Sequence, residues 1–110
     1  MVINRLKNKK VLITYGSTWI PLDQVRVLSN RSSGKLGQLL TTQFKKEGAR
    51  ITLLEGPVEK PFLSKGVRVV RFKFYDELLA LLKQELDKKY DIILHAAAVA
   101  DYQINKVLVN

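Results

Sequence analysis

The chain has 110 residues, of which 46% are apolar, and a formal net charge of +9. This length suits one small domain spanning residues 1–110, and the absence of cysteine excludes disulfide frameworks and thiolate metal sites. No apolar run approaches the roughly 18 residues that a membrane span needs, and no signal-peptide core follows the basic first residues. We expect a cytoplasmic protein whose positive charge attracts polyanions. The basic residues are spread along the sequence and do not form the stripe, interleaved with aromatic residues, that a nucleic-acid-binding surface needs.

Four short apolar runs predict β-strands, at residues 11–15, 50–55, 67–72 and 91–98. The first is apolar on both faces, which is typical of a strand buried in a parallel sheet. The third alternates between apolar and polar residues, which favours an edge position. The fourth also has the composition of a buried strand.

Two amphipathic segments predict helices. The first is expected to begin at Ser32 or Ser33 as N-cap and to end before Gly48. The second is expected to begin with Asp76 as N-cap and to run to about Lys88. The expected buried stripes are Leu36, Leu39, Leu40 and Phe44 in the first helix, and Leu78, Leu79, Leu82 and Leu86 in the second.

This order of elements predicts right-handed crossovers and a parallel sheet with strand order 3-2-1-4. We therefore expect a Rossmann-like, three-layer α/β fold with flanking helices, forming half of a larger doubly wound domain. Ligands of such sheets bind at the carboxyl ends of the strands, here at the switch point between the first and fourth strands. The fourth strand would be an edge, so a partner subunit or a longer chain should cover it.

A long loop, residues 16–37, separates the first strand from the first helix. Ordinary βα loops have about 2–6 residues, and long loops without secondary structure of their own are usually functional. The topology puts this loop opposite the alanine-rich residues 96–98. Gly34 and Lys35 do not complete a P-loop, and Gly16 is not followed by the second glycine of a dinucleotide fingerprint.

The loop residues allow both functional and purely structural roles. Ser32, Ser33 and Gly34 lie where a helix N-terminus favours an anion, but a serine there can also simply cap the helix. Asn30 suits either a carbonyl or oxyanion contact or an Asx turn.

Four other polar positions and one tryptophan have similar alternatives. Arg26 and Arg31 suit either carboxylate or phosphate binding or an ordinary surface. Asp101 suits a metal ion, a sugar hydroxyl or a turn cap. His95 lies mid-strand, where a buried histidine with satisfied hydrogen bonds is favoured over a catalytic base, and Trp19 suits a lid or a partner contact.

Three stretches together carry a family signature. They are I-T-x-G-x-T at residues 13–18, P-L-D-x-V-R-x-x-S-N-R-S-S-G-K-L-G at 21–37, and H-A-A-A-V-A-D-Y at 95–102. In this order they resemble phosphopantothenate–cysteine ligase, the synthetase of coenzyme A biosynthesis. Many bacteria fuse that ligase to a flavin-dependent decarboxylase, but nothing in this sequence matches the decarboxylase half, so we expect no flavin.

The resemblance implies a two-step reaction. The carboxylate of 4′-phosphopantothenate attacks the α-phosphate of CTP or ATP, which releases pyrophosphate and gives an acyl-nucleotidyl intermediate. The amine of L-cysteine then displaces the nucleotide, and Mg²⁺ shields the phosphates. The implied partners are these small molecules, with no nucleic acid and no membrane.

By position, the resemblance assigns Asn30 to contact with the acyl intermediate and Arg26 to a nearby functional role. It assigns the nucleotide site to Gly16, Ser17 and Thr18 on one wall, Ser32, Ser33 and Gly34 at the phosphates, and Ala97, Ala98 and Asp101 on the opposite wall.

This sequence also departs from the family pattern. Tyr15 and Ser17 replace small residues, and Ile20 replaces a common glutamate. The family has a lysine-rich K-x-K-K segment after A-V-A-D-Y, with a catalytic lysine, whereas only Lys106 lies in that region here. Family members are longer and dimeric, so we expect an N-terminal half of the ligase, acting as a homodimer or with a separate C-terminal half.

Other functions stay open. They are a non-enzymatic nucleotide-binding or assembly module, an NAD(P)-dependent oxidoreductase of Rossmann type, and a nucleic-acid binder.

Overall fold

The computed structural model describes residues 5–21, 27–29 and 34–98. The described residues form the strands β1 (Lys10–Ser17), β2 (Trp19–Pro21), β3 (Val27–Ser29), β4 (Arg50–Glu55), β5 (Val67–Arg71) and β6 (Ile92–Ala98), and the helices α1 (Lys35–Lys46) and α2 (Tyr75–Leu86). The four strands predicted from apolar runs are all present, with bounds that differ by at most two residues.

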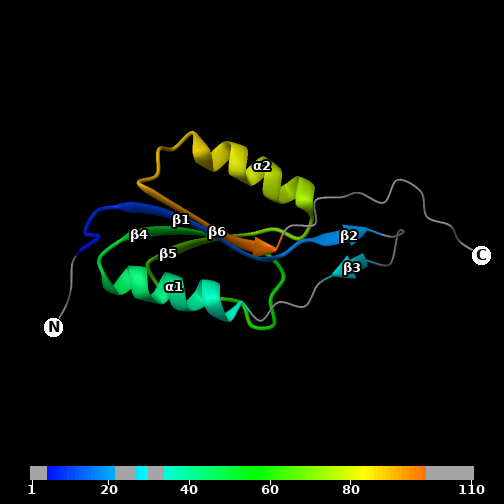
Figure 1. Cartoon of the computed structure of the whole chain (residues 1–110), viewed down its shortest axis with the longest axis horizontal. Coiled ribbons are helices and arrows are strands. Elements are labelled where there is room, and N and C mark those ends of the chain that lie inside the picture. Colours follow the sequence, from blue (N-terminus) through cyan, green and yellow to red (C-terminus); the bar gives the residue numbers. More distant parts are fainter. Residues whose placement is uncertain (1–4, 22–26, 30–33, 99–110) are drawn as a thin grey trace, which may run out of the picture.

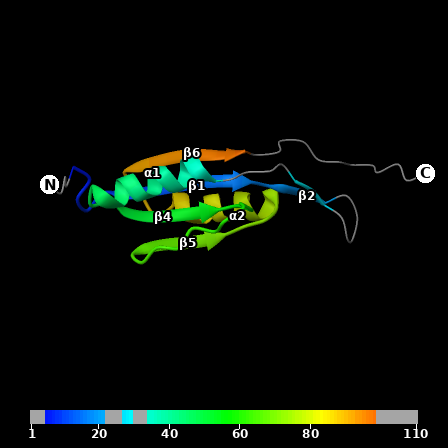
Figure 2. The ribbon, with the colours of Figure 1, turned by 90° about the horizontal axis from the view of Figure 1, so that it is seen from below.

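The main sheet is parallel, with the strand order β5-β4-β1-β6. This confirms the predicted order 3-2-1-4, and Figure 2 shows the four strands side by side in this order. α1 and α2 cover opposite faces of the sheet (Figure 1), so the fold is a three-layer, Rossmann-like α/β arrangement. β5 is one edge, as the alternation in its sequence predicted, and β6 is the other.

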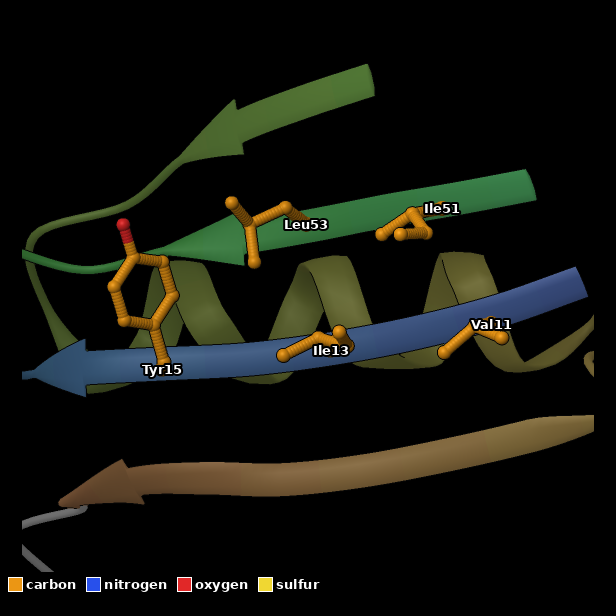
Figure 3. Packing of buried hydrophobic residues seen from close by; sticks show 5 residues of the cluster. All are labelled: Val11, Ile13, Tyr15, Ile51 and Leu53. Atoms are coloured by element: carbon orange, nitrogen blue, oxygen red, sulfur yellow. The ribbon is translucent and has the colours of Figure 1, made fainter. Parts of the chain in front are cut away.

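The core consists of two clusters, one on each face of the sheet. Toward α1, the cluster contains Val11, Ile13 and Tyr15 of β1 with Ile51 and Leu53 of β4 (Figure 3). Toward α2, it contains Leu12, Leu54, Phe72 and Leu78. Successive side chains of a strand point to opposite faces, so a strand that fills both clusters must be apolar throughout. The continuous apolar sequence of β1 therefore follows from its central position.

The long loop after β1 contains secondary structure that the sequence did not predict. β2 and β3 pair in antiparallel fashion, with Trp19 opposite Ser29 and Pro21 opposite Val27. The expectation of a long loop without secondary structure was therefore wrong in part. A two-stranded ribbon explains how so long a connection between β1 and α1 is accommodated.

The helix ends differ from those predicted. The N-cap of α1 is Gly34, with no side-chain cap, whereas the serines predicted as caps lie outside the described residues. Gly48 ends the helix as predicted, with a φ of 90° that suits glycine. The N-cap of α2 is Phe74, whose N–H donates to the Glu77 carboxylate at 3.1 Å. Asp76 therefore lies inside the first turn and is not the cap.

The predicted buried stripes of the helices were also wrong in part. α1 meets the sheet through Gly37, Thr41 and Phe44, whereas two of its predicted stripe residues, Leu36 and Leu39, are exposed. α2 meets the sheet through Leu78, Leu81 and Leu82, whereas Leu79 and Leu86 are partly exposed. The helices have more apolar surface than this sheet alone covers.

A buried carboxylate ties α2 to β5. Glu85 is fully buried and accepts hydrogen bonds from Arg68 at 2.6 Å, Tyr90 at 2.7 Å and Lys88 at 3.2 Å. Burial alone would raise the pKa of the Glu85 carboxyl, but these hydrogen bonds outweigh it and hold the pKa below its ordinary value.

Within the described residues, no helix is long and apolar enough to cross a membrane.

Candidate functional site

The carboxyl ends of β1 and β6 lie side by side, where the topology predicts a ligand site. In the parallel register, Gly16 is opposite Ala97 and Ser17 is opposite Ala98. The N-terminus of α1 reaches the same edge, because Gly34 packs against the ring of Tyr15. The start of the predicted loop and the alanine-rich end of the last strand therefore meet, although about 80 residues separate them in the sequence.

Several predicted site residues lie outside the described residues. These are Arg26, Asn30, Ser32, Ser33 and Asp101. Of the predicted set, the structure describes Gly16, Ser17, Thr18 and Gly34, together with the backbone of Ala97 and Ala98. Their convergence on one edge rests on backbone register and helix placement.

Gly16 is required by a close approach of two chain segments. Its φ is +93°, and a Cβ at this position would lie 2.9 Å from backbone atoms of Gly56. The Gly56 N–H donates to the carbonyl oxygen of Tyr15 at 2.8 Å, which continues the β1–β4 ladder beyond the strands. Glycine at position 16 therefore allows the backbone after β1 to pass close to the backbone after β4 at Gly56.

Ser17 and Thr18 are buried, with side chains directed into the protein. Ser17 is 1% exposed and its hydroxyl donates to the carbonyl oxygen of Pro57 at 3.5 Å, and Thr18 is 3% exposed. Any contact of these two residues with a ligand in this conformation would therefore use the backbone.

Gly34 and Gly37 let α1 rest directly on Tyr15. Gly34 has a φ of +73°, and its Cβ would lie 2.7 Å from the Tyr15 ring and 2.8 Å from Val58. A Cβ at Gly37 would lie 2.4 Å from the same ring. The first turn of α1 contains no acidic residue and includes Lys35, so its charge complements an anion.

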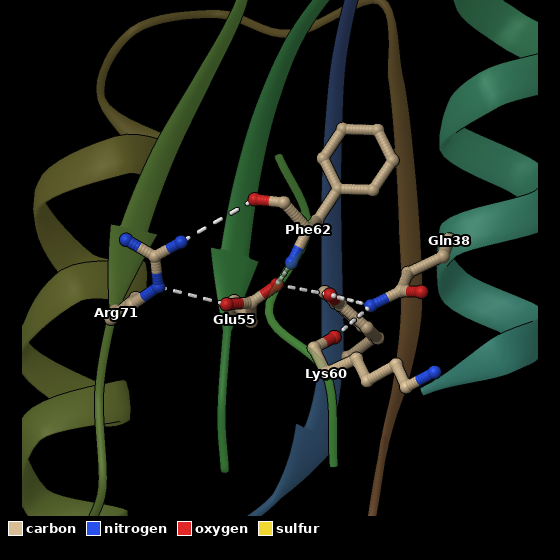
Figure 4. A network of polar contacts seen from close by, with 6 residues as sticks. Gln38, Glu55, Lys60, Phe62 and Arg71 are labelled. Atoms are coloured by element: carbon tan, nitrogen blue, oxygen red, sulfur yellow. Dashed lines mark hydrogen bonds and ion pairs between the residues drawn. The ribbon is translucent and has the colours of Figure 1, made fainter. Parts of the chain in front are cut away.

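Figure 4 shows a buried polar network around Glu55 that the sequence analysis missed. Tyr15 belongs to this network. Its hydroxyl donates to the Glu55 carboxylate, which also accepts from Arg71 at 2.9 Å and from the Phe62 N–H at 2.8 Å. Burial and the hydrogen bond to Glu55 raise the pKa of Tyr15 well above its ordinary value, so this hydroxyl stays a donor. Gln38 of α1 donates to the Tyr15 hydroxyl at 3.1 Å.

This network accounts for the departure of Tyr15 from the small residue of the family pattern. The ring fills the space beneath α1, and the hydroxyl supplies one of the three donors to Glu55. One sequence signal could have indicated the network. Glu55 ends an otherwise apolar strand, and a buried carboxylate requires donors nearby.

A pocket of about 430 Å³ opens at the carboxyl ends of β4 and β5. Its lining includes Gly56, Pro57, Val58, Arg71, Lys73 and Glu77. The pocket therefore lies on the β4–β5 side of the edge, whereas the predicted crevice lies between β1 and β6. The predicted crevice includes residues outside the described ones, so the pocket does not replace it.

His95 differs from its expected setting. It is exposed on the edge strand β6, not buried, although its Nδ1 is hydrogen-bonded to the hydroxyl of the buried Thr14. The described residues contain no group of three or more His, Cys, Asp or Glu side chains that could hold a metal ion.

A family model and several curated proteins match nearly the whole of this chain. The family model of the DNA/pantothenate metabolism flavoprotein C-terminal domain matches residues 6–110. The coenzyme A biosynthesis bifunctional protein CoaBC is 38% identical over 102 residues in Borreliella burgdorferi and 36% identical over 104 residues in Escherichia coli. These alignments cover 89% and 92% of this chain, but only 25% and 24% of those proteins.

Solved structures show the same relationship. The crystal structure of the C-terminal domain of a CoaBC protein superposes with a TM-score of 0.83 at 33% identity, covering 94% of this chain and 52% of that one. A Cab2 mutant in complex with phosphopantothenate-cysteine has a TM-score of 0.74 at 20% identity and covers 89% of this chain and 47% of that one. The second comparison supports the fold alone. The chain thus spans about a quarter of its curated relatives and about half of the solved domain.

Proposed function

The chain belongs to the DNA/pantothenate metabolism flavoprotein C-terminal domain family, and on this premise we propose that it supplies the nucleotide- and phosphate-binding part of a ligase. The reaction joins 4′-phosphopantothenate to L-cysteine in coenzyme A biosynthesis. The observation that supports this most strongly is the pairing of Gly16 with Ala97 and of Ser17 with Ala98 beside the start of α1. Two of the family-like motifs meet there, at the edge where ligands of such sheets bind.

In the proposed reaction, the 4′-phosphopantothenate carboxylate attacks the α-phosphate of CTP or ATP and expels pyrophosphate. The amine of cysteine then attacks the acyl carbon and releases the nucleoside monophosphate. The phosphates would lie at Ser32, Ser33 and Gly34, where the dipole and N–H groups of α1 favour negative charge. Lys35 adds a positive charge to the same turn.

The remaining roles are proposed from the family resemblance. Asn30 would contact the acyl intermediate, and Arg26 would bind a carboxylate or phosphate through its guanidinium group. Ala97, Ala98 and Asp101 would line the opposite wall of the nucleotide site. The family resemblance also implies that Mg²⁺ would accompany the nucleotide phosphates. The absence of a flavin and the cytoplasmic location stay predictions.

Nucleotide protection against thermal unfolding tests the proposal. A ligand at 100 times its Kd stabilises the folded chain by about 2.7 kcal/mol, which raises Tm by several degrees for a domain of this size. CTP or ATP with Mg²⁺ should produce this shift, and NADPH and duplex DNA should not. Ser33→Ala should reduce the shift, whereas Ser64→Ala in the exposed loop after β4 should leave it unchanged.

A larger shift with NADPH than with any nucleoside triphosphate would favour an oxidoreductase and contradict the proposal. Pyrophosphate release in the presence of 4′-phosphopantothenate separates ligation from simple nucleotide binding. A nucleotide-dependent shift without such release would identify a binding module that requires a second polypeptide for chemistry.

A further inference from the structure

In the part of the chain that the structure describes, the N-terminus of α1 lacks the usual local stabilising groups. Its N-cap is Gly34, which provides no side-chain cap, and the first turn contains Lys35 but no acidic residue. A side-chain cap and an acidic first turn are the common local means of stabilising a helix start. The position of this turn must therefore depend on contacts with the rest of the fold.

Gln38 ties the first turn of α1 to two other segments. Its backbone N–H donates to the carbonyl oxygen of Gly34 at 3.0 Å. Its side-chain amide donates to the carbonyl oxygen of Lys60 at 2.6 Å, as Figure 4 shows, and to the hydroxyl of Tyr15 at 3.1 Å. An amide nitrogen carries two N–H groups, so both are engaged within the protein. Gln38 therefore anchors α1 and has no amide N–H left for a ligand.

The other end of this anchor is an ion pair at the edge of the sheet. The Tyr15 hydroxyl donates to the Glu55 carboxylate, which is 1% exposed and accepts from the Arg71 guanidinium at 2.9 Å (Figure 4). A continuous series of hydrogen bonds thus runs from β5 through β4 and β1 to α1. Loss of Arg71 would leave a buried carboxylate short of a donor and would loosen the group that orients the Tyr15 hydroxyl.

Tyr15 also determines where the helix starts. A Cβ at Gly34 would lie 2.7 Å from the Tyr15 ring, so the ring is in direct contact with the N-cap. A shift of this ring would therefore move the N–H groups of the first turn, which would bind the phosphates in the site proposed above. Donors that are held in place before the ligand arrives avoid the cost of ordering them on binding.

On the basis of that nucleotide site, we propose that Gln38 and Arg71 are positioning residues for the nucleotide phosphates. Gln38 holds the first turn of α1 directly, and Arg71 holds it through Glu55 and Tyr15. Neither side chain touches the nucleotide. The affinity for a nucleoside triphosphate therefore depends on a residue of the edge strand β5, which is separated from β1 by β4.

Arg68 offers a matched control for Arg71. Both arginines are on β5, their side chains are 50% and 52% exposed, and each pairs with a buried carboxylate. Arg68 pairs with Glu85 of α2, on the face of the sheet opposite to α1 (Figure 1). Arg68→Leu and Arg71→Leu should therefore both lower the midpoint of urea unfolding, but only Arg71→Leu should weaken nucleotide binding.

The measurement is the Kd for CTP or ATP with Mg²⁺, by isothermal titration calorimetry well below the unfolding temperature. Gln38→Met keeps the length of the side chain but cannot donate, so binding should weaken about fivefold, the factor that one hydrogen bond is typically worth. Arg71→Leu should have a similar effect, and Arg71→Lys, which can still donate to Glu55, should restore most of the affinity. The double variant of Gln38→Met and Arg71→Leu should lose clearly less than the product of the two factors, because both act on the same turn.

Hydrogen exchange without ligand provides a second readout. The amides of Gln38 and Leu39 should exchange faster in Arg71→Leu than in the wild-type chain, and Arg68→Leu should leave them unchanged.

Three results would overturn the positioning role while leaving the nucleotide site in place. They are unchanged affinity in Gln38→Met and Arg71→Leu, equal weakening by Arg68→Leu, and factors that multiply in the double variant. Multiplying factors would mean that Arg71 contributes only its positive charge. The absence of saturable binding by the wild-type chain would contradict the nucleotide site itself, and with it the positioning role.

Discussion

Substitution of Gly37 by alanine tests how α1 is seated on the sheet. In an exposed helix interior, glycine to alanine stabilises by about 1 kcal/mol, because alanine has the higher helix propensity. At Gly37 the added methyl would lie 2.4 Å from ring atom Cδ2 of Tyr15 and 2.6 Å from its Cβ. The ring has little freedom to retreat, since Glu55 and Gln38 are hydrogen-bonded to its hydroxyl.

Forcing an extra methyl into a packed site costs about 1–3 kcal/mol, and here the contact includes a Cβ that cannot rotate away. We therefore expect Gly37→Ala to lower the free energy of unfolding by about 1–2 kcal/mol, despite its favourable propensity. Urea unfolding followed by circular dichroism gives this value from the midpoint and slope. A lower midpoint with an unchanged slope is the expected result.

Thr42→Ala is the control for Gly37→Ala, because Thr42 is exposed on the same helix and its substitution improves propensity without a clash. It should stabilise slightly, by at most about 0.7 kcal/mol. If Gly37→Ala also raised the midpoint, α1 would have room above Tyr15 and would not be closely packed against its ring. Displacement of α1 should also reduce nucleotide protection, since its N-terminus forms part of the proposed phosphate site.

Three further predictions concern other positions. Gly16→Ala should destabilise more than Gly66→Ala in urea unfolding, because both residues have positive φ but only Gly16 has its Cβ position blocked by backbone; equal losses would contradict the close approach. Glu55→Gln should lower the free energy of unfolding by at least about 2 kcal/mol, measured by thermal unfolding. The glutamine amide would place its own N–H₂ group against donors that now bind the buried carboxylate, and an unchanged stability would show that the network is dispensable. The pKa of Glu85 is lowered in the folded chain, so its stabilisation is complete above the ordinary glutamate pKa of about 4.3 and is lost as pH falls through the lower folded value. Glu85→Gln should therefore flatten the acid limb of the stability–pH curve, and an unchanged acid limb would exclude this contribution.

The strands and their order could be predicted because their signals are local and unambiguous. An apolar run as short as residues 11–15 favours a buried strand over a helix by its length. Strands that alternate with helices through right-handed crossovers then favour a parallel sheet. The helix faces could not be predicted as well, because helical periodicity cannot distinguish apolar residues that pack on the sheet from apolar residues that stay exposed. Leu36 and Leu86 fit the predicted stripes and are nevertheless exposed.

The candidate site was predicted in outline, and its supporting residues were missed. The loop after β1 and residues 96–98 could be placed opposite each other because topology alone brings their strand ends together. The Tyr15–Glu55 network depends on contacts between β1 and β4 side chains across the sheet, and no sequence spacing encodes such contacts. The N-cap was missed because Gly34 occupies it with a positive φ, which glycine adopts without strain, whereas sequence rules favour serine.

Backbone amide chemical shifts during a CTP or ATP titration, with Mg²⁺ present, show directly whether a nucleotide binds at the carboxyl ends of β1 and β6. We expect the largest changes on Gly16, Gly34 and Ala97, which lie at these strand ends and at the start of α1. Gly66 directly precedes β5, at the amino ends of the parallel strands, so its chemical shift should not change and serves as an internal reference. Changes confined to the amino ends of the strands, or no saturable change with either nucleotide, would contradict the proposed nucleotide site.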